Sequence, residues 1–194
     1  MTKLLRSTSI HTTLVVCGIV IGTGALLTLM GRIPWCTCGV GLWTSSAWSS
    51  ETSQMLADPY SFSHVLHGIL FFWLLRWIWP RFSLRRLLVI ALLIEVGWEL
   101  FENSPFIIER YRANTASLDY FGDSVLNSLG DLFSEMIGFW LAWKLRWRWA
   151  LLLFIAVELL MLALYRDNLT LNVLMIVWPL GAIKEWQIAG HALS

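Results

Sequence analysis

The sequence predicts an all-α, polytopic transmembrane helical bundle of about six spans, formed as one integral membrane domain over residues 1–194. Three observations predict it. Hydrophobic residues make up 57% of the chain and charged residues only 14%, whereas soluble domains carry about 25% charged residues. Six apolar runs have lengths close to what a bilayer crossing needs. The 13 tryptophans fit this class, because their rings collect at membrane–water interfaces.

The six runs alternate with short basic turns and longer polar loops. We interpret the first run as an uncleaved helix, since no small-residue cleavage site follows it before Arg32. The third ends at Ser104-Pro105, because the residue before a proline disfavours the α conformation. The sixth is short and contains Pro179, so its full crossing stays open. The predicted spans cover about residues 13–31, 62–79, 84–103, 122–143, 149–165 and 169–183.

The basic residues predict the orientation of these spans. Ten lysines and arginines, Lys184 among them, fall on the side of the N-terminus, and four fall on the other side. Cytoplasmic loops carry the excess of positive charge, so both termini are predicted to be cytoplasmic. The protein is then a multi-pass protein of the cell inner membrane, with the lipid bilayer as its surroundings. A net charge of +1 gives no indication of a nucleic-acid partner.

Small residues suggest where helices approach closely. Gly18 and Gly22 form a small-xxx-small pair on the first span, for which we expect packing within the monomer, with dimerisation as the alternative. Gly130, Ser134 and Gly138 give the fourth span a similar face.

Polar residues recur about every four positions on one face of the third and fourth spans, which are expected to run antiparallel. They are Glu95, Glu99 and Glu102 on the third span, and Asp123, Asn127, Asp131 and Glu135 on the fourth. Depth is counted from the outer end of each helix at ~1.5 Å per residue. Glu102 and Asp123 then lie at roughly 2 Å, Glu99 and Asn127 at roughly 7 Å, and Glu95 and Asp131 at roughly 13 Å. His64 and His67 lie one turn apart at the outer end of the second span. The sequence therefore predicts a periplasm-facing polar pocket between spans two, three and four.

A carboxylate inside a bilayer costs about 2.5–3.5 kcal/mol or more, so six acids on two helices require protonation, cationic partners or a bound cation. Arg110 and Arg112, in the loop between the two helices, are candidate partners that could also clamp a phosphate. His64 and His67 with carboxylates could hold zinc, iron or manganese instead. Glu99, Glu102, Asp123 and Asp131 are then the candidate catalytic acid–base groups, with Glu99 and Asp131 also candidate ligands.

Three classes of function remain open. The leading hypothesis is a protein that binds a divalent metal or a lipid or phosphate headgroup and acts on an envelope substrate. Carboxylates at successive depths also suit a proton- or cation-coupled transporter, although no polar residues continue into the cytoplasmic halves of the helices. A structural or assembly subunit, with the pocket as a polar staple between helices, is the third.

Cys36 and Cys38 lie just outside the first span, on the oxidising side under the predicted orientation. Two cysteines this close in sequence rarely bridge each other, because their Cα geometry is unfavourable. Metal binding, pairing between chains and free thiols all stay open.

Four segments carry a resemblance: MGRIPWCTCG, SSETSQMLADPYSFSHVLHG, EVGWELFENSPFIIERYRANTASLDYFGDSVLNS and WPLGAIKEWQ. They resemble a domain-of-unknown-function family of multi-pass inner-membrane proteins, mostly alphaproteobacterial. More distantly, the acid-bearing helices are similar to VanZ-type membrane proteins. The resemblance implies a multi-pass membrane location and no established activity. Among its motif residues are Asn103, Arg110, Tyr111, Arg112 and Asn127, which become the candidate ligand-binding residues.

Overall fold

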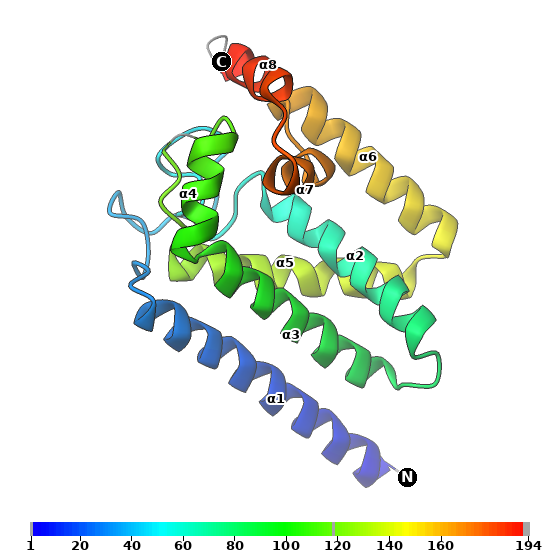
Figure 1. Ribbon diagram of the computed structural model, residues 1–194. Coiled ribbons are helices and arrows are strands. Elements are labelled where there is room, and N and C mark those ends of the chain that lie inside the picture. The colour runs from blue at the N-terminus through cyan, green and yellow to red at the C-terminus, as the bar shows by residue number, and fades with distance from the viewer. Residues whose placement is uncertain (1, 118, 192–194) are drawn as a thin grey trace.

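The computed structural model describes residues 2–117 and 119–191, which form eight helices and no strand (Figure 1). The prediction of an all-α fold is confirmed. The helices are α1 (Thr2–Leu29), α2 (Ser61–Ile78), α3 (Leu84–Glu102), α4 (Pro105–Asn114), α5 (Val125–Lys144), α6 (Trp147–Tyr165), α7 (Leu169–Val177) and α8 (Gly181–His191).

Local sequence explains where several helices begin. Ser83, Ser104, Ser124 and Asn168 each precede a helix, and each side chain accepts a hydrogen bond from a free backbone N–H of the first turn. Pro105 follows Ser104 at the first helical position, where its missing N–H costs nothing. Pro105 therefore separates α3 from α4, and the predicted loop over residues 104–121 contains a ten-residue helix.

Within the described residues, three helical segments are long and apolar enough to cross a membrane: Ile10–Leu29 of α1, all of α2 and all of α6. The helices α3 and α5 have similar lengths, 19 and 20 residues, but they carry the acidic residues. The predicted sixth span, whose full crossing the sequence leaves open, is not one continuous helix. Residues 169–183 are divided between α7, with nine residues, and the start of α8. Nine residues rise only about 14 Å, less than half the hydrocarbon thickness.

The start of α1 and the last helix, α8, lie at opposite ends of the bundle. Figure 1 shows the start of α1 at the same end as the α2–α3 and α5–α6 turns, and α4, α7 and α8 at the opposite end. There the Lys184 ammonium donates to the Ala113 carbonyl at the end of α4. The predicted grouping of Lys184 with the basic residues at the start of α1 is therefore wrong, and the cytoplasmic location of the two termini stays a prediction. Nine basic residues still fall at the N-terminal end and five at the other.

The closest helix contact joins α2 to α5. A Cβ added to Gly68 of α2 would lie 2.0 Å from the Glu135 carbonyl oxygen, and one added to Gly138 of α5 would lie 1.9 Å from the Val65 carbonyl oxygen. The small face predicted for the fourth span therefore packs directly on a backbone. Gly18 and Gly22 behave otherwise, since a Cβ on either would meet nothing within 4 Å. The expectation that they pack within the monomer is wrong.

The polar and apolar parts of the bundle are separated along its length. Toward the end that holds the α2–α3 turn, the core is apolar and includes Ile69, Phe72, Leu87, Phe139 and Ala142. The polar residues of α2, α3 and α5 occupy the other end, under the loops. In those loops a disulfide joins Cys36 to Cys38, contrary to the expectation that cysteines this close do not bridge each other.

Candidate functional site

Two histidines of α2 meet one carboxylate of α3. His64 and His67 lie one turn apart, and both point their Nδ1 atoms at Glu95. The contact of His64 Nδ1 with Glu95 Oε1 is very short, and His67 Nδ1 lies 3.0 Å from Glu95 Oε2. Glu95 is 0% exposed and His64 is 6% exposed, so both groups are removed from solvent. A buried carboxylate held by two imidazoles is satisfied only if the imidazoles donate protons to it.

His64 also faces two further carboxylates. Its Nδ1 lies 3.6 Å from Glu99 Oε1, and its Nε2 lies 3.8 Å from Asp131 Oδ2 on α5. Asp131 accepts a hydrogen bond from the Ser61 hydroxyl at 3.0 Å. Glu99 is 0% exposed, and neither of its carboxylate oxygens has a hydrogen-bond partner among the described residues. A buried carboxylate without partners is costly and indicates a missing proton or cation.

Two overlapping groups of three residues each have ligand atoms close enough to share one ion. His64, His67 and Glu95 each offer an atom within 4.8 Å of the others, and so do His64, Glu99 and Glu102. Imidazole and carboxylate together suit zinc, iron and manganese. His64 belongs to both groups, so the outer end of α2 and α3 holds a candidate metal centre with two alternative sets of three ligands.

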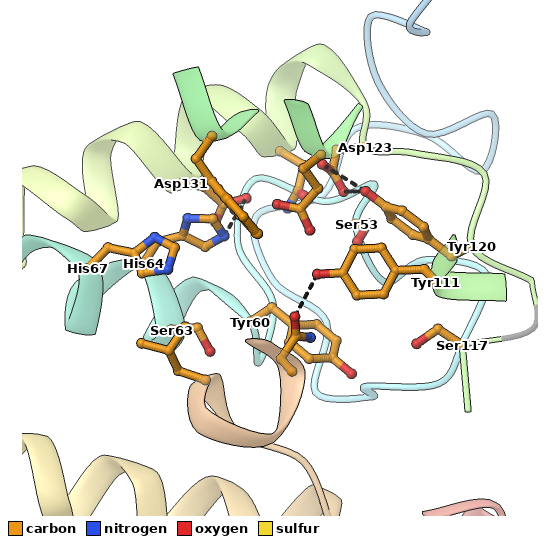
Figure 2. A pocket seen from close by; sticks show the side chains of 15 residues that line it. Ser53, Tyr60, Ser63, His64, His67, Tyr111, Ser117, Tyr120, Asp123 and Asp131 are labelled. Carbon is orange, nitrogen blue, oxygen red and sulfur yellow. Dashed lines mark hydrogen bonds and ion pairs between the residues drawn. The ribbon is translucent and has the colours of Figure 1, made fainter. Parts of the chain in front are cut away.

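A cavity of about 50 Å³ opens beside this centre, large enough for a few water molecules. Figure 2 shows His64, His67 and Asp131 at one end of it and the rings of Tyr60, Tyr111 and Tyr120 toward the other. The tyrosines come from three separate segments: the loop before α2, the helix α4 and the loop before α5. The cavity therefore links the metal-ligand candidates to the polar loops.

The predicted residues around Asp123 position the loop before α5. The Asn103 amide donates to Asp123 Oδ2 at 2.8 Å, and the Asp123 backbone N–H donates to Asn103 Oδ1 at 2.8 Å. The Tyr120 hydroxyl donates to the same carboxylate at 3.1 Å. The Asn127 amide donates to the Met55 carbonyl. Asn103 and Asn127 thus hold loops in place, while Asp123 and Asn127 also line the cavity.

Arg110 and Arg112 do not pair with the acids. The Arg110 guanidinium donates to the carbonyls of Ile176 and Val177 at the C-terminal end of α7, where the helix dipole favours a cation. Arg112 lies over the Phe121 ring, 4.6 Å from its centroid. Neither lines the cavity. Among the described residues the ion pairs are all between histidine and carboxylate. The predicted arginine–carboxylate network is therefore wrong, and the arginine phosphate clamp stays a prediction.

A further buried acid contacts Tyr60 of the cavity wall. Asp167 follows α6, and its carboxylate accepts hydrogen bonds from the Tyr60 hydroxyl at 3.1 Å and from the Asn168 backbone N–H. Burial raises the pKa of Asp167 to about 6, above its ordinary value of 3.8, although these hydrogen bonds act in the opposite direction. The Tyr111 hydroxyl donates to Asn172 of α7 nearby, so α4 and α7 are joined above the cavity.

The raised pKa of Asp167 makes stability depend on pH. Between pH 3.8 and about 6 the folded protein holds a proton that the unfolded chain has lost, so the free energy of unfolding falls as pH rises. The total loss from this group is at most about 3 kcal/mol. We expect Asp167→Asn to remove this part of the slope in unfolding titrations in mixed micelles from pH 4 to 7. Parallel curves for the two proteins would contradict the assignment.

Many of the residues around the cavity could be predicted from the sequence, and others could not. The structure brings together His64, His67, Glu102, Tyr111, Asp123, Asn127 and Asp131 as lining residues, with Glu99 buried behind His64. Glu95 was recognised on the acidic face but not as a site residue, although its four-residue spacing from Glu99 was the signal. Tyr60, Trp98 and Tyr120 were missed, because nothing in their local sequence indicates a shared cavity.

Comparison with known proteins identifies the family of this chain. Residues 27–189 match a family model described as a protein of unknown function, DUF2585. The chain belongs to this family. A UPF0314 protein of Sphingopyxis alaskensis is 49% identical over 178 residues, which cover 91% of this chain and 95% of the relative. A UPF0314 protein of Paracoccus denitrificans is 51% identical over 161 residues, covering 82% and 83%.

A UPF0314 protein of Brucella anthropi is 47% identical over 175 residues, covering 90% of this chain and 89% of the relative. The predicted resemblance to an alphaproteobacterial family of unknown function is confirmed by these DUF2585 and UPF0314 relatives. No solved structure matches the chain. The more distant similarity to VanZ-type proteins stays a prediction.

Proposed function

We propose that this member of the DUF2585 family is a multi-pass inner-membrane protein that binds a divalent metal ion in its outer half and uses it to act on an envelope substrate. The ligands are drawn from His64, His67, Glu95, Glu99 and Glu102. The observation that carries the proposal is Glu99. Its carboxylate is fully buried and has no hydrogen-bond partner among the described residues. It lies 3.6 Å from Nδ1 of His64, an atom that already contacts Glu95.

A bound divalent cation would satisfy both Glu99 and the remaining acids. Removing two or three carboxylates from water is unfavourable unless opposite charge accompanies them, and the described part of the chain places no arginine or lysine beside them. A metal ion supplies Lewis acidity and a water molecule activated at neutral pH. Asp131 and Asp123 line the cavity next to the ligands, where they could accept or return a proton. This arrangement favours hydrolytic or group-transfer chemistry.

The orientation of the site follows from the corrected count of basic residues. With nine lysines and arginines at the N-terminal end and five at the other, the N-terminus is proposed to be cytoplasmic. The cavity and the polar loops lie at the opposite end of the bundle, so they would face the periplasm (Figure 1). Substrates of the cell envelope are the ones within reach of that face.

The test is elemental analysis of protein purified through a tag without histidine. After incubation with zinc, iron(II) or manganese(II) and dialysis, we expect about one metal ion per wild-type chain. A His64→Ala/His67→Ala double variant should retain less than a tenth of it, because it loses both imidazoles. His11→Ala removes an exposed histidine of α1 and should bind as wild type does. Folded wild-type protein that retains no metal from any of the three solutions would refute the proposal.

One observation favours the transporter as a second candidate. Glu135 of α5 lies one turn deeper than Asp131, is 0% exposed, and has no hydrogen-bond partner for either carboxylate oxygen among the described residues. A proton or cation could pass from the cavity to it. Below it, however, the core between α2, α3 and α5 is apolar. Proton-dependent flux in liposomes, abolished by Glu135→Gln, would support this candidate over the first.

A further inference from the structure

A second, larger cavity adjoins the one beside the metal-ligand candidates. It has a volume of about 250 Å³, against about 50 Å³ for the inner cavity. The two share four lining residues, Ser53, Tyr60, Ser117 and Tyr120, so these side chains form a common wall (Figure 2). We call the larger cavity the antechamber. Together the two have the size of a site for one small molecule, with the candidate metal centre at the inner end.

The chemistry of the antechamber is dominated by hydroxyl groups. Ser49, Thr52, Ser53 and Ser117 line it with the two tyrosines. A hydroxyl can donate and accept hydrogen bonds. The hydroxyls of Thr52, Tyr60 and Tyr120 already donate to Ser46, Asp167 and Asp123, so toward a ligand they act as acceptors for groups that donate, as a sugar hydroxyl does. Trp48 contributes an aromatic face and Ile188 of α8 an apolar one. Hydroxyl groups beside flat apolar surfaces complement a sugar or polyol ring, whose edge is polar and whose faces are C–H groups.

The charges of the antechamber exclude an anion. No lysine or arginine from the described ranges lines it, whereas Asp119 does, and the inner cavity adds Glu102, Asp123 and Asp131. In the antechamber itself, away from the candidate metal centre, a phosphate or carboxylate would lie beside Asp119 and no cationic side chain, which is unfavourable. A small organic cation is the remaining charged alternative. It accepts no hydrogen bond, whereas a sugar hydroxyl both accepts and donates, so a cation would use less of the hydroxyl lining.

We propose that the antechamber binds a neutral polyhydroxylated group, such as a sugar or polyol, and directs it toward His64. The inference deepens the proposed function, on which it rests for the reacting centre. It assigns the substrate class to a glycosylated or polyol-bearing envelope molecule rather than to a phosphate headgroup. Ser117 and Ile188 are the residues that the test uses, because Ser117 lies in the common wall and Ile188 closes the antechamber from α8.

The experiment is saturation-transfer NMR with the full chain in phosphatidylcholine nanodiscs. The probes are methyl glucoside, methyl N-acetylglucosaminide, myo-inositol and glycerol, with inorganic phosphate (by ³¹P line width) and tetramethylammonium as the charged comparisons. We expect transfer to at least one neutral probe and none to the charged ones. Ser117→Leu should reduce the signal at least fivefold. Ile188→Trp fills the antechamber from the other side and replaces Ser117→Leu if that variant does not fold.

Two controls separate this inference from the metal proposal. Ser45→Leu changes an exposed serine outside both cavities and should leave the signal unchanged. His64→Ala should keep at least half of the signal, because the antechamber does not require the metal. No transfer to any neutral probe, an equal signal in the filled variants, or binding of a charged probe instead would overturn the inference even if the metal is present. Sugar binding by wild-type protein that retains no zinc, iron or manganese after loading would overturn the metal proposal alone.

Discussion

Gly138→Ala is expected to abolish the folded protein. The added Cβ would lie 1.9 Å from the Val65 carbonyl oxygen, and this atom belongs to the backbone of α2, so no side-chain rotation removes the overlap. The helices α2 and α5 would have to move apart by more than 1 Å. That movement would break the contact of Gly68 with α5 and the alignment of His64 with Asp131. Overpacking typically costs about 1–3 kcal/mol, and this rigid contact is expected at or above the upper end.

The matched control is Gly97→Ala on α3. A Cβ there would meet nothing within 4 Å. Alanine has the higher helix propensity, so the change should leave stability unchanged or raise it by up to about 1 kcal/mol. The comparison is made by size-exclusion chromatography and thermal unfolding of fluorescent fusions in mild detergent. If Gly138→Ala gave a monodisperse peak and a melting temperature within 2–3 °C of wild type, a change of about 1 kcal/mol or less, the close contact of α2 with α5 would be wrong.

The periodicity of α2, α3 and α5 explains why much of the site could be predicted. Residues four apart share a helix face, so Glu95 and Glu99 had to point the same way, and antiparallel helices place Asp131 at the depth of Glu95. The structure has His64 reaching all three. These relations depend on helix geometry alone.

The predictions from sequence failed where tertiary contacts determine the structure. Hydropathy cannot show that the chain breaks at Trp178, so residues 169–183 looked like one span. Once α7 lies at the outer end, its terminal carbonyls attract Arg110, and the predicted pairing of Arg110 with the acids is lost. Tyr120 reaches the cavity through a loop whose path no local pattern specifies. Gly18 and Gly22 carry a packing motif, but within the described residues a Cβ added to either would meet nothing within 4 Å.

Glu99→Gln is expected to change stability and metal binding in opposite directions. In the metal-free protein, the Glu99 carboxylate is fully buried and lacks hydrogen-bond partners among the described residues. An isosteric neutral amide removes a buried charge, so the metal-free variant should be more stable than metal-free wild type by about 1–2 kcal/mol. The amide is also a far poorer ligand than a carboxylate. Metal affinity should therefore fall at least 10- to 100-fold.

The comparison requires unfolding curves and metal titrations of both proteins, each stripped with a chelator and then reloaded. Glu109→Gln is the matched control, because Glu109 is an exposed carboxylate of α4 and should change neither quantity. A purely structural role predicts another result: Glu99→Gln would lower stability, and added metal would not alter either protein. If Glu99 is a metal ligand, Glu99→Gln raises the stability of the metal-free protein and lowers its metal affinity, because the carboxylate destabilises the empty site and stabilises the occupied one.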